Sequence, residues 1–378
     1  MFARNMSKKA NSNKSTVFLT PIESEGPKDA LNRRISMMVL RIGFYDMLSK
    51  GDRVAIKIHP GEHNNTTYIR PTLVSAQVAQ LKKRGFSPFV TESTTLYCRE
   101  RFTHAELVRT AALNGFSTES LSCPFVVADS KPDVSVKING EILKSVGVAA
   151  EIAHSNALMV ISHVTGHGWT AGLAGAVKNL GMGCVGRETK ALIHRATTIV
   201  VNEDLCNACG TCVHTCKSEG IEVRGDVAKL NSRCVRCGVC TGVCPQGALS
   251  ATHDYVAFAK GLAEGASGVL SRFHGRVVFI NVLADITPHC DCEDFSAACA
   301  FPDIGVLVSS DPVAIDQASA DLINQSSPLS GSEADRPEVI AAKDKIFAMF
   351  GIEWWRQLEH AEKLGMGTRN YELVKAKK

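Results

Sequence analysis

Eight of the fourteen cysteines in this 378-residue chain lie within about forty residues, in two copies of one spacing. The first C-x2-C-x2-C-x3-C run is Cys206, Cys209, Cys212 and Cys216, and the second is Cys234, Cys237, Cys240 and Cys244. In iron–sulfur proteins with this run, the fourth cysteine of each copy ligates the cluster held by the other copy. The spacing therefore predicts two [4Fe–4S] clusters, one on Cys206, Cys209, Cys212 and Cys244 and one on Cys234, Cys237, Cys240 and Cys216.

The alternative is a pair of zinc sites. Zinc motifs usually join two C-x2-C halves across a longer gap, so the compact runs favour iron–sulfur clusters. Two such clusters conduct single electrons, and we expect them to be oxygen-sensitive. The sequence does not say where the electrons go.

A second cysteine group lies outside these runs. Cys290 and Cys292 form a C-x-C pair after an apolar strand, and two adjacent thiolates suit one soft metal ion. Cys184, in a glycine-rich loop, is a further ligand candidate for an additional metal of unknown identity, and Cys299 is a weaker one. The alternative is that these are free buried cysteines, as Cys98 and Cys123 are expected to be.

Lys178 and His167 complete the predicted reactive group. Lys178 lies in a run of small residues, AGLAGAVKNLGMG, that lets backbone N–H groups approach an anion. His167, near the end of a strand, is placed to bind a metal or an acidic substrate group. We therefore name Cys290, Cys292, Lys178 and His167 as catalytic candidates, against the alternative that the glycines only permit close packing.

A polar loop after the strand RVAIKI supplies candidates for substrate binding. Arg70 suits bidentate binding of a carboxylate or phosphate, and Glu62 or His59 can move a proton. Loops at the carboxyl ends of parallel strands are where α/β proteins bind ligands.

The elements around these residues alternate between strands and helices. Apolar strands are predicted at 53–58, 88–91, 157–162, 276–283 and 303–308, with helices at 28–48, 72–84, 104–114, 312–324, 337–350 and 354–364. This pattern predicts an α/β body with a mostly parallel sheet and helices on its faces. A small ferredoxin-like α+β insert over 199–252 divides it into 16–198 and 253–378, and 1–15 is expected to be a disordered tail.

Composition narrows the class of protein. Hydrophobic residues make up 45% and charged residues 21%, as in globular proteins, and the net charge of +4 is too small to indicate nucleic-acid binding. No apolar run reaches the ~18 residues of a membrane span, and the polar N-terminus lacks a signal-peptide core. We expect a cytoplasmic protein with reduced thiols.

Several motifs flanking the insert resemble the domain-of-unknown-function 362 family of iron–sulfur proteins. They are KIHPGEHNNTTYIRP, GHGWTAGLAGAVKNLGMG, ITPHCDC and PDIGVLVSSDPVAID. The resemblance runs from about Val54 to Gly367 and implies an α/β protein with a ferredoxin-type insert, without implying a particular reaction. The order of histidine, small-residue run and lysine also has a distant likeness to nickel-dependent lactate racemases.

These features predict an iron–sulfur redox protein that passes single electrons to a substrate or metal site in the α/β body. An iron–sulfur oxidoreductase is the enzyme class this implies, with an unknown small-molecule substrate and a ferredoxin-like or flavoprotein donor as redox partner. The alternatives are a non-catalytic electron-transfer partner of a larger oxidoreductase and a protein of metal or cluster maturation.

Overall fold

The apolar strands of the body form one eight-stranded sheet in the computed structural model, which describes residues 14–22 and 30–376. In spatial order the strands are β16 (Tyr371–Lys375), β1 (Ser15–Pro21), β15 (Gly305–Ser309), β14 (Val277–Leu283), β7 (Ala157–His163), β2 (Arg53–Lys57), β3 (Ser87–Glu92) and β4 (Phe125–Val127). Five of the seven strand pairs are parallel, and only β15 is antiparallel to its neighbours. The predicted α/β class with a mostly parallel sheet is confirmed.

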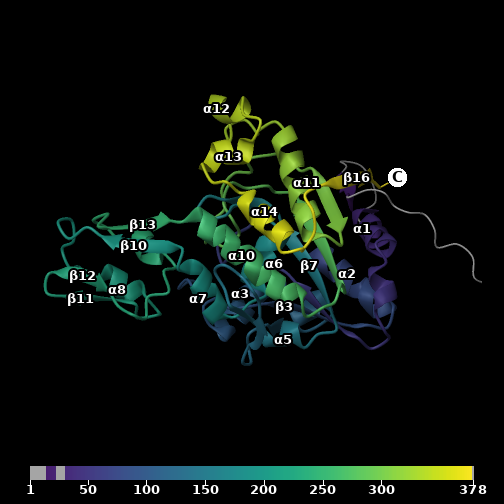
Figure 1. The fold of residues 1–378 in the computed structure, drawn as a ribbon, viewed down its shortest axis with the longest axis horizontal. Coiled ribbons are helices and arrows are strands. Elements are labelled where there is room, and N and C mark those ends of the chain that lie inside the picture. Colours follow the sequence, from purple (N-terminus) through teal and green to yellow (C-terminus); the bar gives the residue numbers. More distant parts are fainter. Residues whose placement is uncertain (1–13, 23–29, 377–378) are drawn as a thin grey trace, which may run out of the picture.

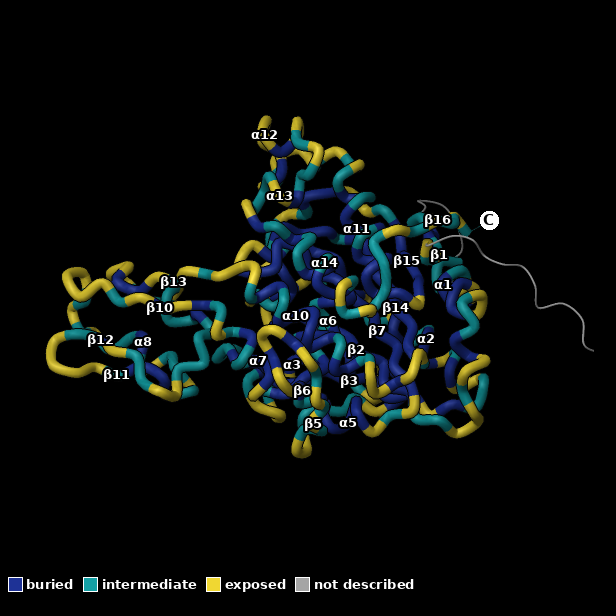
Figure 2. The backbone as a smooth tube through the Cα atoms, viewed as in Figure 1, coloured by how far each residue is buried: buried dark blue, intermediate teal, exposed yellow. Residues whose placement is uncertain are grey.

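Helices cover both faces of this sheet (Figure 1). Along β7 the side chains alternate, so that Leu158 and Val160 enter one hydrophobic core while Met159 and Ile161 enter the other. The first core is covered mainly by α6 (Ala176–Gly183), α10 (Tyr255–Leu270), α11 (Pro312–Gln325) and α14 (Arg356–Lys363). The second is covered by α1 (Ala30–Arg41), the 3-10 helix η1 (Phe44–Met47), α2 (Pro71–Lys83) and α4 (Thr118–Leu121). The tube in Figure 2 shows the sheet strands buried between these layers.

Four neighbouring strands of the sheet end at the same edge. Strands β3, β2, β7 and β14 are mutually parallel, so the loops that follow them meet there. Those loops contain the polar segments after β2 and β7 and the C-x-C pair after β14. Helices α3 (His104–Leu113), α5 (Ala150–Ala153) and α7 (Arg187–His194) and the small sheets β5 (Val134–Lys137)–β6 (Ser145–Val148) and β8 (Thr165–His167)–β9 (Gly172–Ala174) complete the body.

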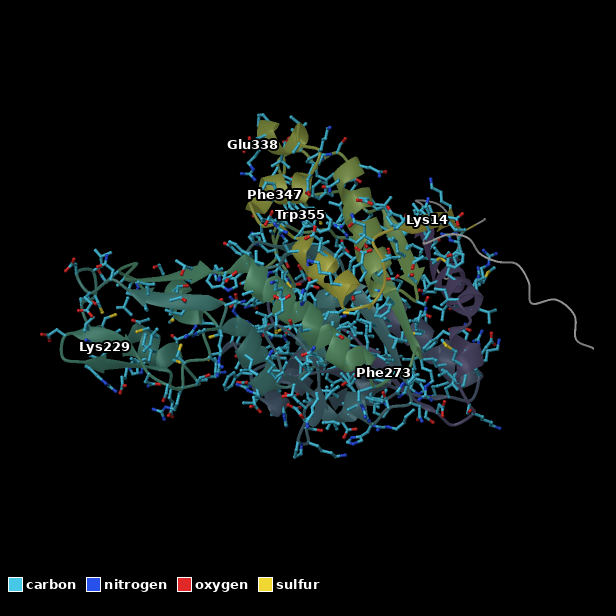
Figure 3. The ribbon with its side chains drawn as sticks, viewed as in Figure 1. Lys14, Lys229, Phe273, Glu338, Phe347 and Trp355 are labelled. Atoms are coloured by element: carbon cyan, nitrogen blue, oxygen red, sulfur yellow. The ribbon has the colours of Figure 1, made fainter. Side chains whose placement is uncertain are left out.

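The cysteine-rich segment projects from the body as an arm (Figures 1 and 3). Antiparallel β10 (Thr197–Val201) and β13 (Leu249–His253) form its base, and between them lie α8 (Thr211–Thr215), the hairpin β11 (Ile221–Arg224)–β12 (Val227–Leu230) and α9 (Val239–Gly242). We call residues 197–253 the arm. Figure 3 shows sulfur atoms along it, and a small core around Ile199, Ile221 and Leu249 packs against its cysteines.

One helix predicted near the C-terminus is divided in two in the structure. The helix predicted at 337–350 is two short helices, α12 (Pro337–Ile340) and α13 (Lys345–Phe350), because the Asp344 side chain accepts the Phe347 N–H and starts a new helix. Of the predicted tail, residues 1–13 lie outside the described part, and Ser15 begins β1. Within the described residues, every helix is too short or too polar to cross a bilayer.

Candidate functional site

The arm gathers its eight cysteines into two groups of four. Cys206, Cys209, Cys212 and Cys244 line one small cavity, which we call the outer set. Cys216, Cys234, Cys237 and Cys240 line a second, which we call the inner set. The four cysteines that the spacing predicts as ligands of one cluster therefore line one cavity in each case, and Cys212 lines both cavities.

Backbone geometry around both sets suits iron–sulfur ligation. The two cysteine loops repeat one conformation, with left-handed φ angles at Ala208 (56°) and Gly210 (76°) and at Arg236 (57°) and Gly238 (80°). The N–H of Ala228 donates to Cys206 Sγ at 3.3 Å and that of Gly220 to Cys216 Sγ at 3.2 Å. Four thiols around a small cavity with N–H donors to sulfur fit a [4Fe–4S] cluster in each set.

A much larger cavity of about 600 Å³, the main cavity, lies where the arm meets the body. Cys237 of the inner set and the adjacent Gly238 line one side of it. The loops at the carboxyl edge of the sheet line the other side, including the C-x-C pair after β14. Inner set and body loops therefore share one space.

The four predicted catalytic candidates meet in the main cavity. Lys178 Nζ donates to Cys290 Sγ at 3.1 Å, and His167 Nε2 lies 3.9 Å from Cys292 Sγ. The two sulfur atoms and the His167 nitrogen all lie within 4.8 Å of one another. Cys184 is outside this group, fully buried at the C-terminal end of α6, and its carbonyl accepts the Ala149 N–H.

Electrostatics make the two thiols unequal. A hydrogen bond from the Cys292 thiol lowers the pKa of Cys290 to about 6, against the effect of burial, and the Lys178 charge lowers it further. The same hydrogen bond and burial raise the pKa of Cys292 well above its usual value. Cys290, which Lys178 contacts, is thus the more acidic thiol of the pair.

A buried ion pair anchors the turn that carries both cysteines. His163 Nδ1 lies 2.9 Å from the Asp291 carboxylate, and His163 Nε2 lies 2.7 Å from the Ala284 carbonyl. Burial opposes the charge on His163, but Asp291 outweighs burial and raises the pKa of His163 to about 9. The imidazolium therefore donates on both sides and ties the end of β7 to the loop after β14.

Asp316 fixes the helix that carries Lys178. Its buried carboxylate accepts the N–H groups of Ala176 at 2.7 Å and Val177 at 2.9 Å, and the Asn281 amide at 2.8 Å. Helix α6 has no side-chain cap of its own, so this carboxylate from α11 serves as the cap.

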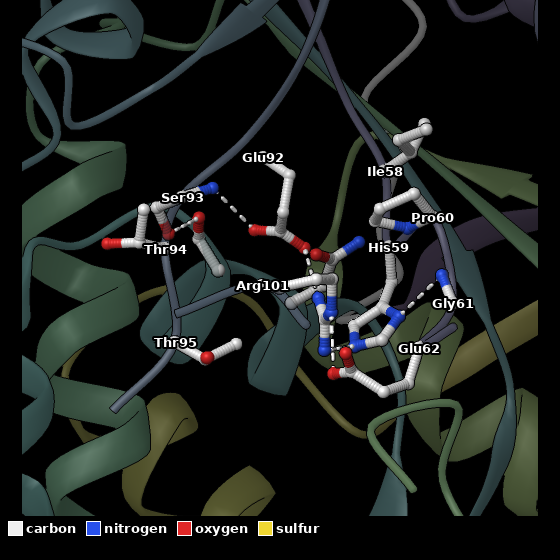
Figure 4. A network of polar contacts seen from close by, with 12 residues as sticks. Ile58, His59, Pro60, Gly61, Glu62, Glu92, Ser93, Thr94, Thr95 and Arg101 are labelled. Atoms are coloured by element: carbon white, nitrogen blue, oxygen red, sulfur yellow. Dashed lines mark hydrogen bonds and ion pairs between the residues drawn. The ribbon is translucent and has the colours of Figure 1, made fainter. Parts of the chain in front are cut away.

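The substrate-binding candidates predicted in the loop after β2 do not all lie at the main cavity. Figure 4 shows Arg101 buried between His59, Glu62 and Glu92, with its guanidinium 3.0 Å from the Glu62 carboxylate and 3.1 Å from His59 Nε2. His59 lines the main cavity, and burial and the Arg101 charge hold its pKa well below the usual value. Glu62 does not line it.

Arg70 lies away from the main cavity. Its side chain is 65% exposed and pairs with Asp285 at 3.2 Å, so the structure does not bring it together with the other substrate-binding candidates. Cys299 and Cys123 also lie outside the cavity lining. His59 is the one candidate of this loop that faces the cavity.

Three features of the site went unrecognised in the sequence. Cys98 lines both the inner set and the main cavity, and its Sγ accepts the Lys217 N–H at 3.1 Å. Trp169 packs so closely on Gly238 that an added Cβ would lie 2.3 Å from its ring. Arg101 organises the loop acids. The sequence does show that Cys98 lies outside every motif. The residues that Cys98 contacts, however, are decided by how the arm docks on the body.

The chain is similar to one described family and to two known proteins. A family model described as a domain of unknown function (DUF362) matches residues 54–321. An uncharacterized ferredoxin of Methanocaldococcus jannaschii is 38% identical over 55 residues, 14% of this chain and 89% of that protein. The lactate racemase apoprotein of Thermoanaerobacterium thermosaccharolyticum aligns with a TM-score of 0.37 and 10% identity over 80% of this chain, which spans 58% of that protein.

Proposed function

The chain belongs to the DUF362 family, and from that premise we propose that it is an iron–sulfur redox protein that moves single electrons between its arm and a reaction site at Cys290 and Cys292. The similarity of a segment to a ferredoxin supports an electron-transfer role. When bound, two [4Fe–4S] clusters supply one-electron chemistry. One observation supports delivery of electrons from the arm into the body: Cys237 and the C-x-C pair line the same cavity.

The residues of the chain divide this work between them. The outer set includes the exposed Cys209, which makes it accessible to a redox partner protein. The inner set faces the main cavity through Cys237. In the cavity, Lys178 donates to Cys290, while His59 and His167, whose pKa values lie well below the usual value, line the space for a substrate as uncharged imidazoles.

The test compares reoxidation of the reduced protein. Protein purified without oxygen is analysed for iron and sulfide, about eight of each per chain for two clusters. It is then reduced with dithionite and mixed with a small disulfide, a quinone and a nitro compound in turn. At least one acceptor should reoxidise wild type about tenfold faster than the Cys290→Ser/Cys292→Ser variant, whereas Cys299→Ser should match wild type.

Equal rates for wild type and the double variant with every acceptor would refute delivery into the cavity. The chain would then be a carrier that presents its clusters to a larger oxidoreductase.

A further inference from the structure

The turn that carries Cys290 and Cys292 presents each sulfur to a different donor group of the body. Lys178 Nζ donates to Cys290 Sγ at 3.1 Å, and His167 Nε2 lies 3.9 Å from Cys292 Sγ. One residue, Asp291, separates the two cysteines, and their sulfur atoms are within 4.8 Å of each other. Rotation of the two side chains is the movement needed to bring them to bonding distance.

A metal ion held by His167, Cys290 and Cys292 is the first alternative, and the protonation of His167 argues against it. The N–H groups of Thr170 and Ala171 both point at His167 Nδ1, each at 3.3 Å. A ring nitrogen that accepts N–H bonds carries no proton, so in the neutral ring the proton is on Nε2. The nitrogen that faces the sulfur atoms is then a donor and has no lone pair for a metal.

We propose that Cys290 and Cys292 are a dithiol–disulfide couple that exchanges two electrons with a low-molecular-weight disulfide bound in the main cavity. In the reductive half, the S–S bond between Cys290 and Cys292 breaks on uptake of two electrons and two protons. The electrons come one at a time from a reduced ferredoxin-type donor. One proton goes to the Cys292 sulfur, and the other is shared between the Cys290 sulfur and the Lys178 amine.

The oxidative half is thiol–disulfide exchange. Cys290 attacks one sulfur of the substrate disulfide and expels the first substrate thiol. Cys292 then attacks Cys290 in the mixed disulfide, which expels the second substrate thiol and restores the S–S bond. Two thiols of the protein become one disulfide, and one substrate disulfide becomes two thiols, so atoms and electrons balance.

The asymmetry of the pair suits these two roles. The attacking sulfur must be a thiolate, and Lys178 donates to Cys290 and not to Cys292. The second sulfur must remain protonated until the mixed disulfide forms, and Cys292 is the half-buried cysteine beside His167, at a distance from the Lys178 charge that Cys290 contacts. The cavity of about 600 Å³ has room for a small disulfide beside this pair.

The test measures the oxidation state of the pair directly. Anoxic holoprotein is equilibrated in mixtures of reduced and oxidised dithiothreitol, quenched with acid, and alkylated under denaturing conditions. Mass spectrometry of the peptide that contains 290–292 then counts the alkyl groups it carries. We expect a two-electron titration in which the peptide passes from two alkyl groups at these positions to none, with a mass lower by two hydrogens.

Two variants make the result specific. Cys292→Ser should abolish the disulfide and leave Cys290 alkylated at every ratio, with iron content unchanged. Cys299→Ser should leave the titration of the pair unchanged, because Cys299 is outside the main cavity. Full alkylation of Cys290 and Cys292 at every ratio would overturn the proposal. So would one equivalent of metal beyond the cluster iron that disappears in Cys292→Ser.

This inference rests on the proposed function for its electron source, but different results would refute the disulfide couple and the delivery of electrons from the arm. Dithiothreitol reduces the pair without help from the arm, so a disulfide that titrates normally and yet stays closed when dithionite reduces the clusters upholds the couple and refutes delivery. A pair that never closes, in a protein whose reoxidation still depends on the cavity, refutes the couple alone.

Discussion

Replacement of Asp291 by Asn should destabilise the body by an amount that depends on pH. The change removes the negative partner of His163, whose two nitrogens are satisfied by Asp291 and the Ala284 carbonyl. Because Asp291 raises the pKa of His163 from 6.5 to about 9, the charged pair contributes about 3 kcal/mol to the free energy of unfolding.

The sign follows from linkage. A histidine whose pKa is higher in the folded state gives its full stabilisation below the unfolded value of 6.5. That stabilisation is lost as the pH rises through about 9, where the folded imidazolium loses its proton. The Asp291→Asn variant should therefore be about 3 kcal/mol less stable than wild type at pH 6, and nearly equal to it at pH 10.

Urea unfolding followed by tryptophan fluorescence measures this difference, since all three tryptophans lie in the body. Glu338→Gln is the matched control. Glu338 pairs with Arg336 in solvent, so its loss should cost under about 1 kcal/mol at either pH. A loss in Asp291→Asn that is equal at pH 6 and pH 10 would refute the ion pair as its source.

Three further substitutions test how the site is built. Lys178→Met should raise the pKa of Cys290 from about 6 and slow its alkylation by iodoacetamide at pH 7, and an unchanged rate-versus-pH profile would contradict the role of the ammonium. Asp316→Ala leaves two buried N–H groups of α6 without an acceptor and should lower the free energy of unfolding by about 3 kcal/mol; a loss below about 1 kcal/mol would show that water replaces the cap. Trp169→Ala removes the ring that packs on Gly238 and should make the arm roughly tenfold more sensitive to proteolysis. A tenfold change corresponds to a loss of about 1.4 kcal/mol in the free energy of docking. An unchanged cleavage rate would show that other contacts hold the arm on the body.

Much of the architecture was readable from local patterns in the sequence. The apolar runs at 157–162 and 276–283 predicted buried strands because residues buried on both faces of a sheet show no alternation of polarity, and the two strands pair in the sheet. The spacing of the arm cysteines predicted two groups of four, and the four cysteines of each group line a common cavity. These features depend on neighbours along the chain, which the sequence displays directly.

The composition of the main cavity depended instead on which loops the sheet brings together. The sequence placed Lys178 and Cys290 on separate segments, and only the parallel pairing of β7 with β14 and the packing of α6 put them 3.1 Å apart. Arg70 was a good anion-binding candidate by residue type, yet its position just before α2 directs it to solvent.

Cys98 is a residue that gained a place at the site only through the tertiary structure. It belongs to no motif, and the expectation was a free structural cysteine, but docking of the arm places it between the inner set and the main cavity. Residue types and local spacing therefore determined the elements and the chemistry available to this protein. The tertiary fold decided which of those groups meet, because contacts between distant segments are set by sheet order and packing and leave no periodic trace in the chain.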